Sequence, residues 1–188
     1  MKTALILHGM PSEEEYFDPN NPTPSNNHWL PWMRKELFDN GIVAEVLDFP
    51  EPYKPDYEKW KKIFEQHQID QYTILIGHSC GGGFLVRWLS ENKIPVGKVA
   101  LVAPWINPKD PRPIPGFFDF EIDTELADRT EGISLFVSSD DDKEELETAE
   151  FLQEKIKGLK VLKFTDRGHF VFGDMKTNEF PELLNEVI

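Results

Sequence analysis

A serine stands between two glycines in the stretch Gly77-His78-Ser79-Cys80-Gly81. An apolar run typical of a buried strand precedes this stretch, and a helical pattern follows it. G-x-S-x-G between a strand and a helix is the pattern of a nucleophile elbow, a sharp turn that presents the serine hydroxyl above a helix N-terminus. Side chains at either glycine would collide with the neighbouring strand and helix. The motif therefore predicts Ser79 as a nucleophile.

A serine nucleophile needs a base, and the base needs an acid that orients it. In the order typical of this motif the acid follows the serine and the histidine comes last. His169 follows the strand predicted at residues 160–164, and three acids, Asp140, Asp141 and Asp142, follow the strand predicted at 134–138. His169 is the candidate base. Any of the three aspartates could hold it, although aspartate before a helix is also a common cap.

An acyl-transfer site also needs backbone N–H groups for the developing oxyanion. We expect one from Cys80, the residue after the nucleophile, and one from Met10, in the loop after the first strand. Cys80 itself is expected to be a small buried residue. His78 is more plausible as a structural neighbour than as the base, and His8 is expected to shape the loop beside the serine.

Apolar runs and helical patterns alternate along the whole chain, which predicts one α/β domain over residues 1–188 with a doubly wound, mostly parallel sheet. We predict helices over residues 29–40, 56–68, 81–92, 142–157 and from 178 to the end. The predicted strands cover the following residues: 3–7, 43–48, 73–77, 98–103, 134–138 and 160–164.

Two segments look irregular, and both follow the carboxyl end of a predicted strand, the edge where open α/β sheets bind ligands. They cover residues 10–27 and the Pro/aromatic-rich loop at 104–128. Trp29, Trp105, Phe117 and Phe118 are candidates for an apolar substrate pocket, and ordinary core or loop packing is the competing interpretation.

The composition limits the classes of partner. The chain has 188 residues, with 34 acidic against 20 basic side chains and a net charge of −14. Phosphate contacts need Lys and Arg, so nucleic acid and anionic membranes are not expected as partners. A single cysteine excludes an internal disulfide and fits a reducing, cytoplasmic location. No apolar run approaches the roughly 20 residues that span a bilayer.

Cofactor motifs are missing from the sequence. A phosphate loop would need Lys and then Ser or Thr after its last glycine, whereas Gly83 and Phe84 follow Gly82. No dinucleotide, zinc-protease or calcium-loop pattern occurs, so we expect no cofactor and no metal.

Four stretches of the sequence resemble one family: the first strand with His8-Gly9, the segment from Asn27 to Leu37 with its two tryptophans, the elbow, and the aspartates with the segment from Phe164 to Phe170. The chain resembles the small single-domain serine hydrolases of the α/β-hydrolase superfamily, in the group of retinoblastoma-binding protein 9 and YdeN. This resemblance implies a six-stranded sheet in the order 2-1-3-4-5-6. It also implies that Asp141 is the triad acid, although the residues after it depart from the family pattern.

The sequence thus predicts a serine hydrolase with Ser79, His169 and Asp141 as its triad, most simply a carboxylesterase for small neutral esters. Acidic residues near the expected site should disfavour anionic substrates. The alternatives are a protein-interaction module on a hydrolase scaffold with a residual triad, or a peptidase or thioesterase with the same residues. The sequence identifies no protein partner.

Overall fold

The computed structural model describes residues 2–106, 114 and 116–188. A six-stranded sheet with every pairing parallel forms its centre, in the order β2-β1-β3-β4-β5-β6. The predicted sheet and its order are therefore confirmed. The strands are β1 (Thr3–Leu7), β2 (Val43–Leu47), β3 (Thr73–His78), β4 (Val99–Val102), β5 (Ile133–Ser138) and β6 (Lys160–Phe164).

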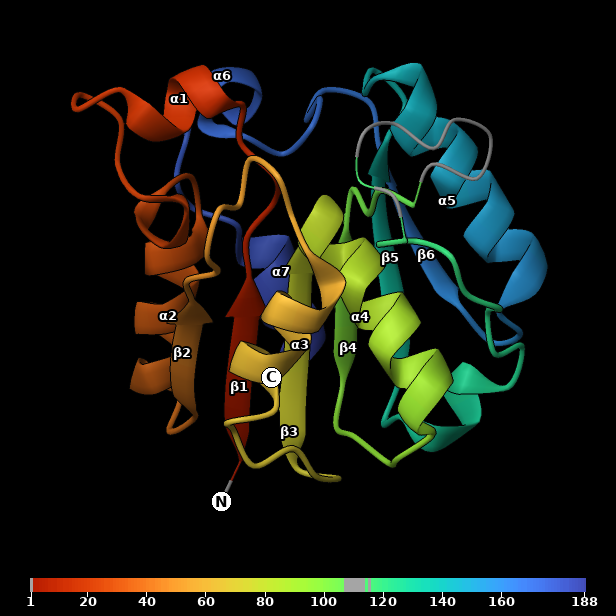
Figure 1. Cartoon of the computed structure of the whole chain (residues 1–188). Coiled ribbons are helices and arrows are strands. Elements are labelled where there is room, and N and C mark those ends of the chain that lie inside the picture. The colour runs from red at the N-terminus through yellow and green to blue at the C-terminus, as the bar shows by residue number, and fades with distance from the viewer. Residues whose placement is uncertain (1, 107–113, 115) are drawn as a thin grey trace.

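Helices cover both faces of the sheet (Figure 1). The main helices are α2 (Leu30–Asp39), α3 (Tyr57–Phe64), α4 (Cys80–Asn92), α5 (Lys143–Lys155) and α7 (Pro181–Val187). One face packs on α3, α4 and α5, and the other packs on α2 and α7. Alternate residues of β1 enter the two cores, with Leu5 on the first face and Ile6 on the second. Burial on both faces explains why the inner strands β1, β3, β4 and β5 read as nearly continuous apolar runs, whereas the edge strands β2 and β6 are partly exposed.

The segment at residues 10–27 is less irregular than predicted, because it contains the short helix α1 (Glu13–Phe17) and a 3₁₀ turn, Pro24–Asn26. The Ser12 hydroxyl accepts from the Glu15 N–H at 3.1 Å, and the Glu15 carboxylate accepts from the Ser12 N–H at 2.8 Å. This reciprocal capping box stabilises the helix without core packing, since no residue of α1 is buried. The sequence Ser-x-x-Glu was the signal for it.

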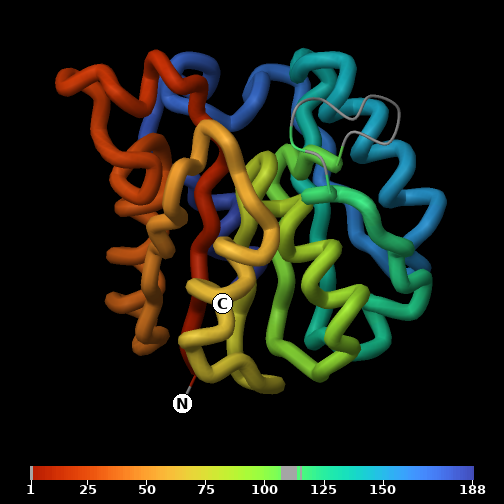
Figure 2. The backbone as a smooth tube through the Cα atoms, viewed as in Figure 1, coloured from red at the N-terminus to blue at the C-terminus, as the bar shows by residue number. Residues whose placement is uncertain are grey.

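The loops at the carboxyl edge of the sheet frame the site. Figure 2 shows the chain after β1 and the chain after β2 meeting at this edge, and the short helix α6 (Phe172–Met175) lies there as well. Of the loop predicted at 104–128, residues 107–113 and 115 lie outside the described residues. Leu126–Arg129 at its end forms a 3₁₀ turn.

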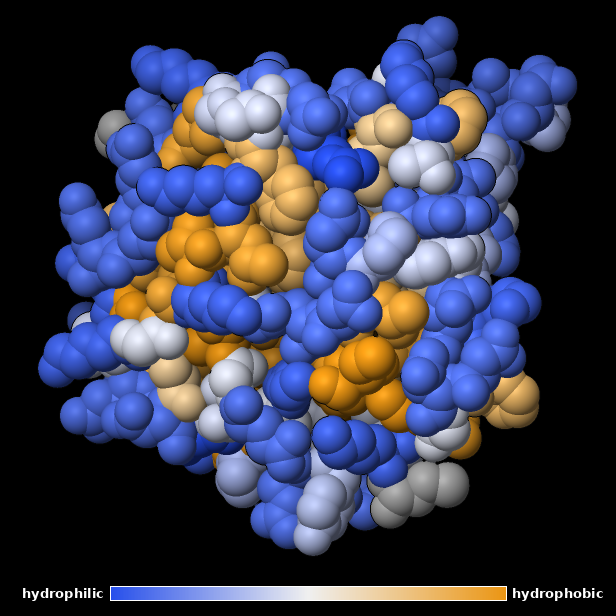
Figure 3. Space-filling view, turned by 180° about the vertical axis from the view of Figure 1, so that it is seen from behind, coloured by the Kyte–Doolittle hydropathy of each residue, from blue (hydrophilic) through white to orange (hydrophobic). Residues whose placement is uncertain are grey.

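The face turned away from the viewer in Figure 1 is largely hydrophilic, with apolar patches between the polar side chains (Figure 3). Within the described residues, no helix combines the length and apolar character needed to cross a membrane.

Candidate active site

Ser79 lies at the turn between β3 and α4 in a strained backbone conformation, with φ 52° and ψ −121°. A Cβ atom on Gly77 would lie 2.7 Å from the Gly81 carbonyl oxygen, and one on Gly81 would lie 2.5 Å from the His8 carbonyl oxygen. Both positions therefore require glycine, as the sequence predicted. The Ser79 N–H donates to Val102 O at 2.9 Å, which ties the turn to the neighbouring strand. Strain of this kind persists where the surrounding structure enforces it and is concentrated at functional sites.

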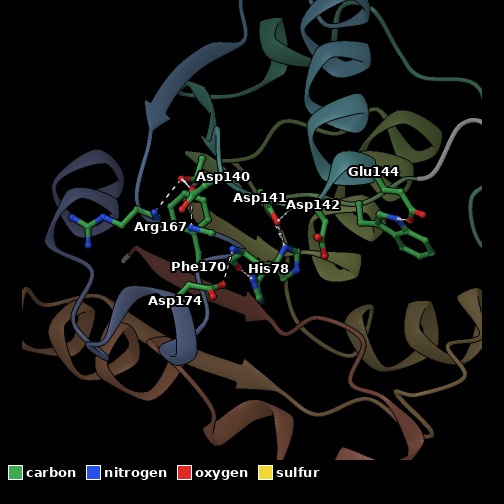
Figure 4. Close-up of polar contacts among 12 residues, drawn as sticks. His78, Asp140, Asp141, Asp142, Glu144, Arg167, Phe170 and Asp174 are labelled. Carbon is green, nitrogen blue, oxygen red and sulfur yellow. Dashed lines mark hydrogen bonds and ion pairs between the residues drawn. The ribbon is translucent and has the colours of Figure 1, made fainter.

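Asp141 and His169 form a hydrogen-bonded pair. His169 Nδ1 lies 3.0 Å from Asp141 Oδ1 and 3.3 Å from Oδ2. Figure 4 shows Asp141 with its neighbours Asp140 and Asp142. The Asp141 side chain is buried, whereas the His169 side chain is 27% exposed. Burial alone would lower the pKa of His169, but the hydrogen bond and charge of Asp141, with the charges of Glu145 and Asp142, raise it above its usual value. The carboxylate accepts from Nδ1–H, so the other ring nitrogen is left to accept a proton.

The aspartates on either side of Asp141 make no hydrogen bond to the His169 ring among the described contacts. Asp140 Oδ1 accepts from the Gly168 N–H at 3.0 Å and from the Ser138 hydroxyl, so Asp140 anchors the loop that carries His169. Asp142 occupies the N-cap position of α5, yet its side chain makes no capping hydrogen bond. Of the three candidate acids, only Asp141 contacts the His169 ring among the described contacts.

Two further contacts fix the backbone around His169. His78 Nε2 lies 2.8 Å from the His169 carbonyl oxygen and must donate to it, because a carbonyl oxygen only accepts. Burial, with the charges of neighbouring histidines, places the pKa of His78 well below its usual value. Asp174 Oδ2 accepts from the His169 N–H at 2.9 Å. His78 is therefore a neutral anchor of the histidine loop.

The loop after β1 lies against the serine: a Cβ atom on Gly9 would be 3.0 Å from Ser79 Cβ. The buried His8 ring donates from Nδ1 to the Gly9 carbonyl oxygen at 2.7 Å. A trans peptide directs its N–H opposite to its C=O, so this bond also sets the direction of the Met10 N–H. Cys80 is buried and is the first residue of α4, where N–H groups lack intrahelical acceptors.

A cavity of about 270 Å³ brings Ser79, His169 and Met10 to one wall. Among the described contacts, no hydrogen bond joins the Ser79 hydroxyl to the His169 ring. Much of the remaining lining comes from the segment after β1, and Tyr16 is one of the lining residues there that the sequence did not single out. In the described part of the chain, no lysine or arginine lines this cavity.

The four aromatic residues proposed for a substrate pocket have other positions, and none lines this cavity. Trp29 is fully buried, and its indole N–H donates to Phe170 O at 3.0 Å. Trp105 is 4% exposed, Phe117 is 1% exposed, and Phe118 packs against both. The core-packing interpretation therefore describes Trp29, Trp105 and Phe117, and the partly buried Phe118 packs against the same core.

A parallel sheet in this order, flanked by helices on both faces and carrying a serine at the β3–α4 elbow, defines an α/β-hydrolase fold. The family model for serine hydrolases matches residues 20–184. The chain therefore belongs to the serine hydrolase family and is a hydrolase.

Relatives of known sequence and structure agree with this family. YdeN of Bacillus subtilis (strain 168) is 34% identical over 106 residues, a match that covers 54% of this chain and half the length of YdeN. Serine hydrolase RBBP9 of Rattus norvegicus is 29% identical over 168 residues, 85% of this chain and 84% of that protein. The crystal structure of the B. subtilis ydeN gene product superimposes with a TM-score of 0.81 at 23% identity, covering 98% of this chain and 96% of that one. Est1E of Butyrivibrio proteoclasticus, solved with ferulic acid, gives 0.68 at 12% identity, covering 100% and 86%.

Proposed function

We propose that this serine hydrolase cleaves small neutral carboxylic esters by acyl transfer, with Ser79 as nucleophile, His169 as base and Asp141 as the acid that orients the base. The observation that carries this proposal is the single cavity that Ser79 and His169 share, with the His169 ring hydrogen-bonded to the buried Asp141. This is the arrangement of groups that activates a serine hydroxyl.

In the proposed reaction, Ser79 Oγ attacks the ester carbonyl carbon while His169 takes the hydroxyl proton. The Met10 and Cys80 N–H groups stabilise the oxyanion. The tetrahedral intermediate expels the alcohol, which takes the proton from His169, and leaves an acyl group on Ser79. A water molecule then attacks the acyl carbon, gives a proton to His169 and releases the acid, and the proton returns to Ser79.

The charges at the cavity support neutral substrates. Glu15 is the carboxylate among the described lining residues, and no described lysine or arginine is there to bind an anionic group. Burial lowers the pKa of both His8 and His28, so these two rings are neutral near pH 7. An ester that carries a phosphate, sulfate or second carboxylate would lose its hydration without gaining a cationic partner.

A fluorophosphonate and a panel of acyl substrates test the proposal. Wild-type protein should gain the mass of one adduct, and the Ser79→Ala variant should gain none while keeping its circular dichroism and melting temperature. Matched neutral esters, amides and thioesters then identify the bond that is cleaved. A folded wild-type protein that gains no adduct, or an adduct that persists in Ser79→Ala, would refute Ser79 as the nucleophile.

A further inference from the structure

Three aromatic side chains with exposed surface form a cluster at the mouth of the Ser79 cavity. Tyr16 and Phe17 belong to α1 and are 40% and 63% exposed, and the half-buried Tyr53 follows β2. Their ring centroids lie 5.1 Å apart for Tyr16 and Phe17, 5.2 Å for Tyr16 and Tyr53, and 5.4 Å for Phe17 and Tyr53. We call these three residues the aromatic rim.

The aromatic rim is continuous with the cavity, because Tyr16 lines the cavity together with Ser79 and His169. The helix that carries two of its rings buries no residue and depends on its own capping box. The rim therefore presents ring surface beside the cavity while adding no side chain to the hydrophobic core. Contiguous exposed apolar surface is a frequent mark of a binding site.

The size of the cavity gives the rim a role. A volume of about 270 Å³ lies just below the roughly 300–1,000 Å³ that is typical of ligand pockets. A short acyl or alcohol group fits entirely inside, and a longer chain or a ring on a longer linker can extend along the wall that Tyr16 contributes. At Tyr16 that wall leads onto Phe17 and Tyr53. The neighbouring Glu13, Glu14 and Glu15 make this exit unfavourable for an anionic group.

We propose that the aromatic rim binds an apolar chain or ring of the substrate, so that the preferred substrates are neutral esters carrying a medium-length alkyl or aryl group. This inference rests on the proposed ester hydrolysis and adds the substrate class. The apolar group could belong to the acyl or to the alcohol part, and the two parts are tested separately.

The test compares kcat/KM for 4-nitrophenyl octanoate with that for the acetate, and for benzyl acetate with that for methyl acetate. In the Phe17→Ala/Tyr53→Ala double variant, the ratio in at least one pair should fall about tenfold, mainly through KM, which is roughly the effect of two buried methylene groups. Phe17→Leu, which keeps an apolar side chain, should retain most of the ratio.

Phe38→Ala is the matched control, because Phe38 is an exposed aromatic residue far from the cavity, with 68% of its surface exposed. It lies eight residues after the cavity residue Leu30 in α2, which corresponds to about 12 Å at 1.5 Å per residue. Both ratios should match the wild type in this variant. If a fluorophosphonate labels Ser79 but neither ratio changes in the double variant, the rim only fixes α1 in place, and the proposed function stands without it. If wild-type protein is neither labelled nor active on any ester, both proposals fail.

Discussion

Asp140 and Asp141 are neighbours in the chain, and removing their charges should have very different effects. In Asp141→Asn, the side chain loses its charge and gains an NH2 group that can donate to His169 Nδ1, which favours the tautomer with the proton on Nε2 and leaves no free nitrogen for the serine proton. The same change in serine proteases lowers kcat by about 10⁴, equivalent to about 5.4 kcal/mol of transition-state stabilisation. We expect a loss of that order in kcat/KM for a neutral ester.

The pH profile of Asp141→Asn gives a second readout. Activity requires neutral His169, so kcat/KM falls as the pH drops through the pKa of this residue. Burial lowers that pKa, and Asp141 is the main group that raises it. Without the carboxylate the pKa falls, and the acid limb of the profile should move to lower pH.

Asp140→Asn serves as the control, because the asparagine still offers an oxygen to the Gly168 N–H and Asp140 is not among the charges that raise the pKa of His169. We expect at most a loss of about tenfold, the effect of roughly one weakened hydrogen bond, and an unchanged acid limb. The assay is ester hydrolysis between pH 5 and 9 on variants with matched melting curves. A loss of about 10⁴ in Asp140→Asn together with a nearly normal Asp141→Asn would refute the assignment of the acid.

Other changes probe the elbow, the oxyanion donor and the buried histidines. Gly81→Ala places Cβ 2.5 Å from a backbone oxygen and should lower the free energy of unfolding by at least about 2 kcal/mol. In the control Gly173→Ala, Cβ meets nothing within 4 Å, so the free energy of unfolding should stay unchanged. Equal melting temperatures of the two variants would contradict this expectation. His8→Leu removes the donor to Gly9 O, so the Met10 N–H loses its fixed direction and kcat should fall by about 10–100-fold. His8→Asn keeps a donor in a similar place and should lose less activity. Equal kcat values in both variants would argue against the role of His8. Burial lowers the pKa of His78, so the unfolded chain binds a proton that the native state does not, and stability should fall as the pH drops below the usual histidine range. Urea unfolding at pH 8 and 5.5 should show a smaller decrease for His78→Gln than for wild type, and identical decreases would contradict the argument.

The inner strands β1, β3, β4 and β5 were predictable because burial on both faces leaves a signal that does not depend on neighbouring elements. The edge strand β6 is only partly buried, and its apolar residues Val161, Leu162 and Phe164 marked it in the sequence. The prediction over residues 73–77 differs from β3 by one residue, and the first and last strands agree in full. Helix ends were less predictable. The helix predicted over 56–68 ends at Phe64. His67 fits the helical spacing of the sequence, but it lies in the turn that follows, where its ring contacts Phe64 O.

The elbow that holds Ser79, the proposed nucleophile, was predictable because its backbone geometry depends on glycines that can be read directly in the sequence. The proposed acid, Asp141, was indicated only by the family resemblance, since helix capping and histidine orientation favour the same residue type at the same place. Three consecutive aspartates satisfy both patterns, and only the direction of each carboxylate separates Asp141, which faces the His169 ring, from Asp140, which faces the backbone of the loop. The four aromatic residues predicted for a substrate pocket do not line the Ser79 cavity, because residue type does not say which way a side chain turns.

The histidines at the carboxyl edge of the sheet differ in pKa and in role because their surroundings differ. Burial lowers the pKa of His8, His28 and His78. Each ring makes one hydrogen bond to the backbone of a loop beside the cavity: His8 and His78 donate to carbonyl oxygens, and His28 accepts from an N–H. His169 is also largely enclosed, yet Asp141 reverses the effect of burial on its pKa. Groups of one chemical type whose environments move their pKa values apart take different roles in a site. Three neutral rings therefore hold the loops in place, and the ring paired with a buried carboxylate is the one suited to accept and return a proton.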